Sequence, residues 1–232
     1  FIAQIIDGAL GMAYGVTSTS FLLSLGVSPA VASASVHTAE IFTTGTSGMS
    51  HFKLGNVDRT LFKRLLVPGI LGGVLGAYIL TSIPGSVIKP FIAIYLMIMG
   101  VRILLKTRQP TISIKKIQPI PLAGVGGFCD AIGGGGWGPI VTSTLVANGH
   151  NPRISIGTVN TTEFFVTASE AVTFVLLMRS VQLEIILGLM IGGVIAAPMA
   201  AVICKRLSSR VLMLSVGVLI IFLSIRTLVQ VF

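Results

Sequence analysis

Two glutamates lie at matching places inside long apolar stretches, where a carboxyl group could take up and release a proton. Glu40 follows His37 by three residues, and Glu163 follows Asn160 by three. Residues at this spacing share a helix face. A charged carboxylate in apolar surroundings is costly and must face protein or water, which makes it a candidate functional group. We expect Glu40 or Glu163 to carry a proton, with His37 as an orienting hydrogen-bond partner. The alternative is that both acids only hydrogen-bond unwound backbone.

Two glycine-rich stretches, each opened by an aspartate, are expected to break helices. The first opens with Asp7 and the second with Asp130. Their glycines are Gly8, Gly11 and Gly15 in the first, and Gly133 to Gly136 with Gly138 in the second. Runs of glycine unwind a helix, because glycine adopts backbone angles that other residues avoid. A short acid can accept hydrogen bonds from the N–H groups of the following half-helix, so we interpret both aspartates as caps; a coupling-ion site is the alternative.

The two breaks are also candidate binding sites for an anion. The N-terminus of a half-helix offers free N–H groups and a positive potential, and glycine lets the backbone approach a ligand closely. Hydroxyl groups after each break add neutral donors, although such groups also join helices in lipid. The competing interpretation of the glycines is that they let two hairpin tips pack together. The candidate substrate-binding residues are Gly11, Tyr14, Gly15, Thr19, Ser20 and Thr38 in the first half, and Gly134, Gly135, Gly136, Trp137, Thr142, Ser143, Asn160 and Thr161 in the second.

Composition places the chain in a membrane. Hydrophobic residues make up 53% and charged residues only 10%, with a mean hydropathy of +0.96, whereas a soluble domain has roughly a quarter of its residues charged. The net charge of +9 does not indicate nucleic-acid binding, because the basic residues lie between apolar stretches. Cys129 and Cys204 form no CxxC pair and give no disulfide framework. We therefore expect no metal and no other cofactor.

Eight apolar stretches follow one another along the chain. They are residues 1–26, 29–52, 60–83, 86–105, 117–148, 152–178, 182–204 and 209–232. Six are uniform enough for a membrane-spanning helix, which needs about 20 mainly apolar residues. The first and fifth contain the glycine stretches and are predicted to be broken or re-entrant helical hairpins, because unwound backbone in a membrane must be covered by protein or water. The predicted fold class is an all-α polytopic membrane protein.

The two halves of the chain align with each other, which indicates an internal duplication. At a shift of 123 residues, Asp7 falls on Asp130, Tyr14 on Trp137 and Glu40 on Glu163. Further matches pair Gly11 with Gly134, Gly15 with Gly138, Gly26 with Gly149, Pro29 with Pro152, Thr38 with Thr161 and, after one extra loop residue, Gly69 with Gly193. Matches at glycine and polar positions do not follow from a shared apolar composition. We predict a first membrane repeat at 1–108, a basic cytoplasmic linker at 109–118 and a second repeat at 119–232.

The distribution of basic residues indicates that the two repeats have opposite orientations. Three loops hold 12 of the 16 lysines and arginines, namely Lys53, Arg59, Lys63 and Arg64, then Arg102, Lys106, Arg108, Lys115 and Lys116, and finally Lys205, Arg206 and Arg210. If these three loops are cytoplasmic, the other four, Lys89, Arg153, Arg179 and Arg226, are expected on the outer side of the membrane. Because basic loops face the cytoplasm, each repeat must cross the membrane an odd number of times, as one re-entrant hairpin plus three spanning helices. Inverted repeats with broken helices are typical of secondary transporters; a parallel repeat is the alternative.

Several of these motifs also carry a family resemblance. They are the stretch Asp7 to Gly15 and the turn Leu25 to Pro29 in the first half, Gly55 to Asp58 after the second stretch, and Gly133 to Pro139 with Gly149 to Pro152 in the second half. With them the chain resembles the TauE/SafE sulfite exporter family over nearly its whole length. The resemblance implies a multi-pass transporter of sulfite or a small organosulfur anion, such as a sulfonate or thiosulfate, in a prokaryotic inner membrane. The first half departs from the pattern, because Met12-Ala13-Tyr14 stands where the second half has a glycine run.

Other functional classes fit the sequence less well. A membrane-embedded enzyme would need a nucleophile or a redox pair, and the sequence contains no CxxC, HExxH or GxSxG motif, so no catalytic residue is predicted. A passive anion channel and a carrier for a small carboxylate remain open. The direction of transport, the coupling ion and the oligomeric state also remain open.

Overall fold

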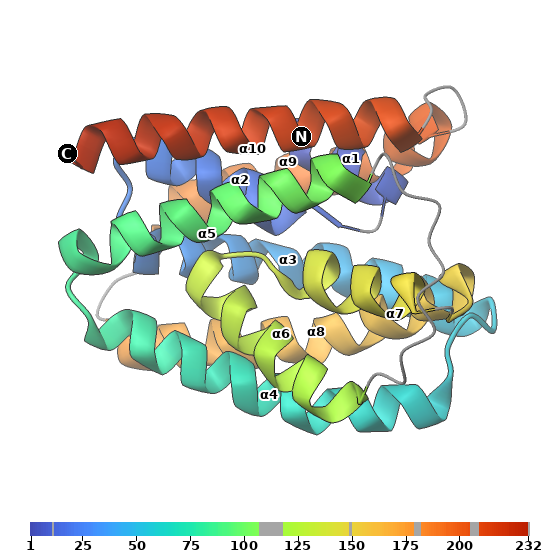
Figure 1. Cartoon of the computed structure of the whole chain (residues 1–232). Coiled ribbons are helices and arrows are strands. Elements are labelled where there is room, and N and C mark those ends of the chain that lie inside the picture. Colours follow the sequence, from blue (N-terminus) through green and yellow to red (C-terminus); the bar gives the residue numbers. More distant parts are fainter. Residues whose placement is uncertain (11, 107–117, 149, 179–181, 205–208, 232) are drawn as a thin grey trace.

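The chain folds into a bundle of helices, seen in a computed structural model that describes residues 1–10, 12–106, 118–148, 150–178, 182–204 and 209–231 (Figure 1). The helices are α1 Ile2–Leu10, α2 Tyr14–Ser24, α3 Pro29–Lys53, α4 Arg59–Ser82, α5 Gly85–Lys106, α6 Pro119–Gly133, the π-helical turn η1 Gly138–Thr142, α7 Ser143–Ala147, α8 Pro152–Leu177, α9 Leu183–Cys204 and α10 Ser209–Val231. Each helix lies within one of the expected apolar stretches, to within two residues at its ends. The all-helical class is confirmed.

The first and fifth apolar stretches are broken, as predicted. The first stretch divides into α1 and α2 around Met12 and Ala13. The fifth stretch divides after α6, at Gly134 to Gly136. Figure 1 shows α6 and α7 running in opposite directions, so that this stretch returns to the end of the molecule from which it started. Gly11, most of the 109–118 linker, Gly149, and the basic residues Arg108, Lys115, Lys116, Arg179, Lys205 and Arg206 lie outside the described residues.

Helices of the two halves pack on each other in matching pairs. The two long helices α3 and α8 pack together, and so do the last helices of the halves, α5 and α10. Helix α4 packs on α6 and α8, while its counterpart α9 packs on α1 and α3. Exchanging the two halves therefore reproduces this set of contacts. In Figure 1, α5 runs from left to right and α10 from right to left.

Hydrogen bonds between the two halves of the chain define two ends of the bundle. At one end, which we call the basic end, Arg153 Nε donates to Asn56 Oδ1 at 2.6 Å and the Asp58 N–H donates to Thr158 Oγ1 at 2.9 Å. At the opposite end, Gln230 Nε2 donates to the Ser24 carbonyl at 3.0 Å. Arg153 therefore lies at the same end as the loop of residues 53–64, and its expected place on the opposite side is wrong, because α6 and α7 return the chain to the end from which it started.

Large apolar side chains cover much of the outward surface. On α4 and α5, Leu71, Tyr78, Phe91 and Ile98 are at least half exposed, which a soluble protein rarely tolerates over a wide area. By length and composition, α4 and the part Gly85–Leu105 of α5 could each cross a membrane. Helices α3 and α8 are as long but carry more polar residues, and in α9 and α10 the described apolar stretches Leu183–Ala196 and Gly217–Gln230 are shorter.

Glycines on α4 allow α6 to approach closely. A methyl group on Gly76 would lie 2.6 Å from the Phe128 carbonyl oxygen, and one on Gly72 would lie 3.0 Å from the Phe128 nitrogen. Small residues at a helix interface allow such contact between backbones. The glycine spacing on this helix therefore serves packing and fixes the position of α6, which carries Asp130.

Candidate functional site

Each helix break is capped by the aspartate that precedes it. The Tyr14 N–H donates to Asp7 Oδ1 at 3.2 Å, and the Trp137 N–H donates to Asp130 Oδ1 at 2.9 Å. The Gly136 N–H also donates to Asp130 Oδ1. Tyr14 and Trp137 are equivalent in the internal alignment, as are the two aspartates, so both halves make the same bond. The predicted capping role is present in both breaks.

The two breaks meet tip to tip. A methyl group on Gly15 would lie 2.6 Å from Gly135 Cα, and Thr19 Oγ1 donates to the Gly134 carbonyl at 2.6 Å. Gly134 and Gly135 have φ angles of +64° and +144°, a region that glycine tolerates and other residues avoid. Ala13 has φ of +126° despite its side chain, so the first tip carries backbone strain. The glycines therefore let the two tips pack closely, which is the alternative interpretation to anion binding.

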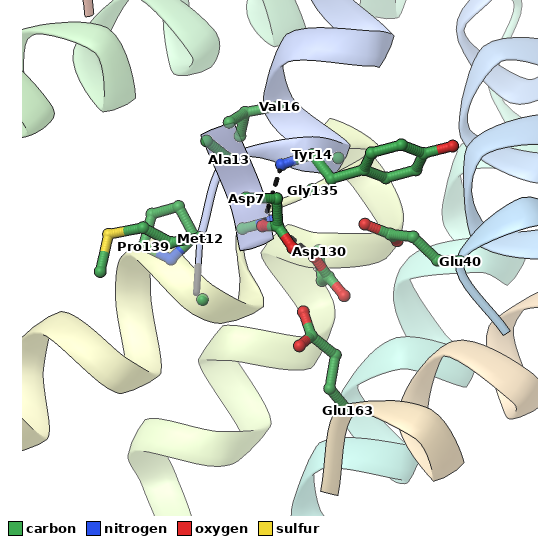
Figure 2. A pocket seen from close by; sticks show the side chains of 13 residues that line it. Asp7, Met12, Ala13, Tyr14, Val16, Glu40, Asp130, Gly135, Pro139 and Glu163 are labelled. Carbon is green, nitrogen blue, oxygen red and sulfur yellow. Dashed lines mark hydrogen bonds between the residues drawn. The ribbon is translucent and has the colours of Figure 1, made fainter. Parts of the chain in front are cut away.

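A small cavity lies between the two tips, and its polar lining is acidic. Figure 2 shows four carboxyl groups that point toward this space from α1, α3, α6 and α8: Asp7, Glu40, Asp130 and Glu163. The rest of the lining comes from Met12, Ala13, Tyr14, Gly15, Val16, Gly135, Gly136, Gly138 and Pro139. Among the described residues, no lysine or arginine lines it. The volume of this cavity is about 10 Å³, which is room for roughly one water molecule.

The candidate residues from the sequence divide into three groups in the structure. The cavity brings together Tyr14, Gly15, Gly135, Gly136, Glu40 and Glu163. Gly134, Trp137, Thr19 and His37 lie behind the tips, where they hold the tips in place. Thr38, Ser143, Asn160 and Thr161 hydrogen-bond helix carbonyls or a side chain between helices, and Ser20 and Thr142 are buried. Gly11 lies outside the described residues.

Most of the expected hydroxyl donors are engaged with backbone. Thr38 Oγ1 donates to the Ala34 carbonyl at 2.7 Å, and Ser143 Oγ donates to the Pro139 carbonyl, both four residues earlier. Serine and threonine inside helices commonly make this bond. Thr142 Oγ1 and Ser20 Oγ are buried without a hydrogen-bond partner. Neither of these two residues lines the cavity between the tips.

Behind the cavity, His37 lies between two acids from the other half of the chain. His37 Nε2 is 2.8 Å from Glu170 Oε2 and 3.6 Å from Asp130 Oδ2, and all three side chains are at most 3% exposed. On the opposite side of the ring, Nδ1 lies 2.7 Å from the Ser33 carbonyl oxygen. The three side chains offer ligand atoms within 4.8 Å of one another. The 2.8 Å separation of His37 Nε2 and Glu170 Oε2 is that of a close ion pair, although neither atom has a hydrogen-bond partner.

Two residues of this region are not among the site residues predicted from the sequence. The helical spacing places Glu170 on the face of Glu163, where it could pair with a neighbouring helix, and in the structure it lies beside His37 of α3. Tyr95 of α5 was not considered, yet its hydroxyl is buried without a hydrogen-bond partner beside Gly136. The spacing on one helix reveals which residues share a face but not which helix that face meets. The signal available for Tyr95 was a polar aromatic in the middle of an otherwise apolar stretch.

The aromatic residue after each break packs against a glycine of the other half. The Trp137 ring lies on Gly69 of α4, where a methyl group would come 2.6 Å from the ring, and the Tyr14 ring lies beside Gly193 of α9. Gly69 and Gly193 are equivalent in the internal alignment. The Tyr14 hydroxyl donates to the Leu189 carbonyl at 3.0 Å, and Trp137 Nε1 donates to the Val159 carbonyl at 3.2 Å. Both tips are thus fixed by an aromatic ring.

Comparison with known proteins gives two matches. The family described as sulfite exporter TauE/SafE matches residues 1–227. A protein of Bacillus subtilis (strain 168) called "Probable membrane transporter protein YtnM" is 44% identical over 240 residues, which cover 99% of this chain and 80% of that protein. No solved structure matches the chain.

Proposed function

Because the chain belongs to the sulfite exporter TauE/SafE family, we propose that it is a secondary transporter of sulfite or a small organosulfur anion, such as a sulfonate or thiosulfate. It is a helical membrane protein, and the proposal adds a multi-pass location in a prokaryotic inner membrane. The observation that carries the proposal is the cavity between the two helix breaks, to which both halves contribute equivalent acids. A site built at broken helices between two repeats is where secondary transporters bind their substrates.

The acidic lining determines how an anion could be bound. Four ionised carboxylates would repel it, because like charges at close range in a site shielded from water interact strongly. A protonated carboxyl group is instead a hydrogen-bond donor. Because the cavity as it stands has room for roughly one water molecule, we propose that the two tips move apart to admit the anion beside protonated Glu40 and Glu163, while Gly135 and Gly136 let the backbone come close. Neutral donors also suit a carrier, because the ligand must be able to leave.

The proposed architecture is a pair of inverted repeats. The matching helix contacts, the opposite directions of α5 and α10 and the return of α6 and α7 to one end all support it. The basic end contains Lys53, Arg59 and Arg153, whereas Lys89 and Arg226 lie toward the opposite end. The bias of lysine and arginine toward the cytoplasm favours a cytoplasmic basic end.

Cysteine labelling tests this topology. In a variant without Cys129 and Cys204, Leu54→Cys at the basic end should react with a membrane-impermeant maleimide only from the cytoplasmic side. Ser86→Cys, exposed in the first turn of α5, should react only from outside. Asn151→Cys is the decisive position, since a re-entrant hairpin places it on the same side as Leu54→Cys. Labelling of Asn151→Cys together with Ser86→Cys would contradict the inverted repeat and favour the parallel one.

Transport assays in proteoliposomes test the substrate and the role of the protons. We expect saturable uptake of at least one of sulfite, thiosulfate and methanesulfonate. For thiosulfate and methanesulfonate, whose charge does not change near neutral pH, initial rates should rise roughly tenfold as the pH on the substrate side falls by about two units, because protonation removes the repulsion in the cavity. A current that grows linearly with voltage and does not saturate would instead identify a passive anion channel, and uptake confined to small carboxylates would identify the other alternative.

Substitution of the two glutamates tests whether Glu40 and Glu163 carry the protons that transport requires. Glu40→Gln and Glu163→Gln keep a hydrogen-bonding amide of the same shape but cannot release a proton. We expect each to weaken the pH dependence of transport and the double variant to remove it. Glu184→Gln, at an exposed position on α9, is the matched control. Wild-type rates across the whole pH range in the double variant would show that these acids carry no proton.

A further inference from the structure

The pair formed by His37 and Glu170 must hold a proton. A backbone carbonyl can only accept a hydrogen bond, so the 2.7 Å contact with the Ser33 carbonyl assigns a hydrogen to His37 Nδ1. His37 Nε2 and Glu170 Oε2 approach each other to 2.8 Å, and unless one of the two groups carries a proton, their lone pairs repel each other at this distance. Either the imidazole is a cation beside a carboxylate, or it is neutral and accepts from a protonated carboxyl group. The fold thus encloses an exchangeable proton on two fully buried side chains.

This proton lies next to the aspartate that holds the second helix break. Asp130 faces His37 Nε2 with Oδ2, at 3.6 Å, and holds the Gly136 and Trp137 N–H groups with Oδ1. Asp130 Oδ2, both carboxyl oxygens of Glu170 and His37 Nε2 have no hydrogen-bond partner, and all three side chains are at most 3% exposed. The two oxygens of Asp130 therefore join the buried proton to the tip that forms one wall of the cavity.

The same contact exists in the other half of the bundle without ionisable groups. The 123-residue shift that aligns the halves places His37 on Asn160 and Ser47 on Glu170. Asn160 Nδ2 donates to Ser47 Oγ at 3.1 Å, across the same two helices α3 and α8. A neutral pair of side chains at this position is therefore sufficient for α3 and α8 to pack together. In one half only, this position holds a histidine and a glutamate, which can exchange a proton.

We infer that His37, Glu170 and Asp130 form a proton-binding site, separate from Glu40 and Glu163, whose occupation controls the tip at Gly134 to Gly136. The step takes up one proton from water and involves no other chemistry. Before it, the His37 imidazolium lies beside two carboxylates, Glu170 and Asp130. The incoming proton neutralises Glu170, and the proton on His37 Nε2 passes to Asp130 Oδ2, which leaves a neutral imidazole with Nδ1–H beside two neutral acids. A neutral Asp130 holds the Gly136 and Trp137 N–H groups more weakly than a carboxylate does, which frees the tip to move.

The charges around this site favour uptake of protons. Five of the seven acidic residues in the chain gather here, since Glu40 on α3 and Glu163 on α8 interact electrostatically with Glu170 and Asp130, and Asp7 on α1 interacts with both glutamates. Tyr95 on α5 faces Asp130. Helix α4 faces Glu170 with Gly73, where a methyl group would lie 2.8 Å from Glu170 Cγ. With His37 as the one cationic side chain described among these acids, additional protons are needed to balance the charge.

Fluorescence of Trp137 tests the site without any substrate. Trp137 is the only tryptophan in the chain, is fully buried and donates to Asp130 through its N–H group. In purified protein, its emission should change in one transition as the pH is varied. The variant H37N/E170S copies the neutral pair of the other half, so it should fold and lose this transition. Glu184→Gln, as the control, should keep it. A transition unchanged in folded H37N/E170S would overturn the proposal, and so would one that follows sodium concentration rather than pH.

A transport assay distinguishes a site that couples proton movement to transport from a pair with a structural role only. The interpretation of this assay depends on the proposed function. Glu170→Gln offers His37 Nε2 an amide hydrogen in place of the carboxyl hydrogen, so it preserves the contact but has no proton to release. With sulfur-35-labelled thiosulfate in proteoliposomes, E170Q should exchange internal for external thiosulfate at nearly the wild-type rate. Its net uptake driven by a pH gradient should fall about tenfold or more.

The possible outcomes are distinct. Equal loss of exchange and of proton-driven uptake in a folded E170Q variant would indicate a structural role and overturn the proposal. If wild-type protein transports no thiosulfate, the proposed function fails for this substrate, whereas the Trp137 titration still decides the proton site. If H37N/E170S does not fold, the same titration on E170Q decides it, because a transition identical to that of wild type would again contradict the proposal.

Discussion

Gly135→Ala is expected to prevent recovery of folded, monodisperse protein. The added methyl group would lie 2.5 Å from Gly15 Cα, against backbone that cannot move without separating the tips, and the residue has φ of +144°. A positive φ costs an ordinary residue about 1–2 kcal/mol, and the overlap adds about 1–3 kcal/mol or more. Size-exclusion chromatography in detergent and the thermal unfolding midpoint provide the measurement.

Gly26→Ala is the matched control for this prediction. Gly26 has φ of +91°, but a methyl group there would meet nothing within 4 Å. Only the cost of the backbone conformation applies, so the variant should remain folded with a small decrease in its unfolding midpoint. If Gly135→Ala and Gly26→Ala lose the same stability, the contact between the tips does not contribute to folding.

Asp130→Ala is expected to destabilise the protein more than Asp7→Ala. The first change removes the acceptor of two backbone N–H groups, those of Gly136 and Trp137, and the second removes the acceptor of one, that of Tyr14. Each buried donor left without a partner costs about 1–3 kcal/mol. Thermal unfolding midpoints followed by light scattering should therefore fall in the order wild type, Asp7→Ala, Asp130→Ala.

The asparagine variants separate the caps from the charges. Asp130→Asn and Asp7→Asn keep a side-chain oxygen that can accept the same backbone hydrogen bonds. Each should recover most of the stability that the alanine variant loses. If Asp130→Asn is as unstable as Asp130→Ala, then the tip is stabilised by the negative charge of Asp130 beside His37. The hydrogen bonds that Asp130 accepts would then contribute little to stability.

The sequence predicted the helices and the partners within each break, because these depend on local pattern. Apolar length and glycine position located α4, α5 and both breaks to within two residues. The duplication predicted that Asp7 and Asp130 have equivalent roles, and the structure gives them the same hydrogen bond to Tyr14 and Trp137. It also paired Glu40 with Glu163, and both line the cavity.

Contacts that depend on how helices face each other could not be predicted in the same way. Glu170 meets His37 only because α3 and α8 pack together, and one residue's position along a helix does not reveal the partner helix. Hydroxyl groups such as Thr38 and Ser143 bond their own helix backbone, which competes with any ligand and which the sequence pattern does not show. The acidity of the cavity likewise emerges only when four helices converge.

The unequal contacts between α3 and α8 have a consequence for the direction of transport. Two perfectly equivalent inverted halves would give the inward-open and outward-open states of a carrier equal free energies when the solutions on both sides are the same. His37 with Glu170 in one half, and Asn160 with Ser47 in the other, remove this equality. If the protein is the proposed carrier with inverted halves, its empty form has a preferred resting orientation, and acidity on one side of the membrane changes that preference more than the same acidity on the other side.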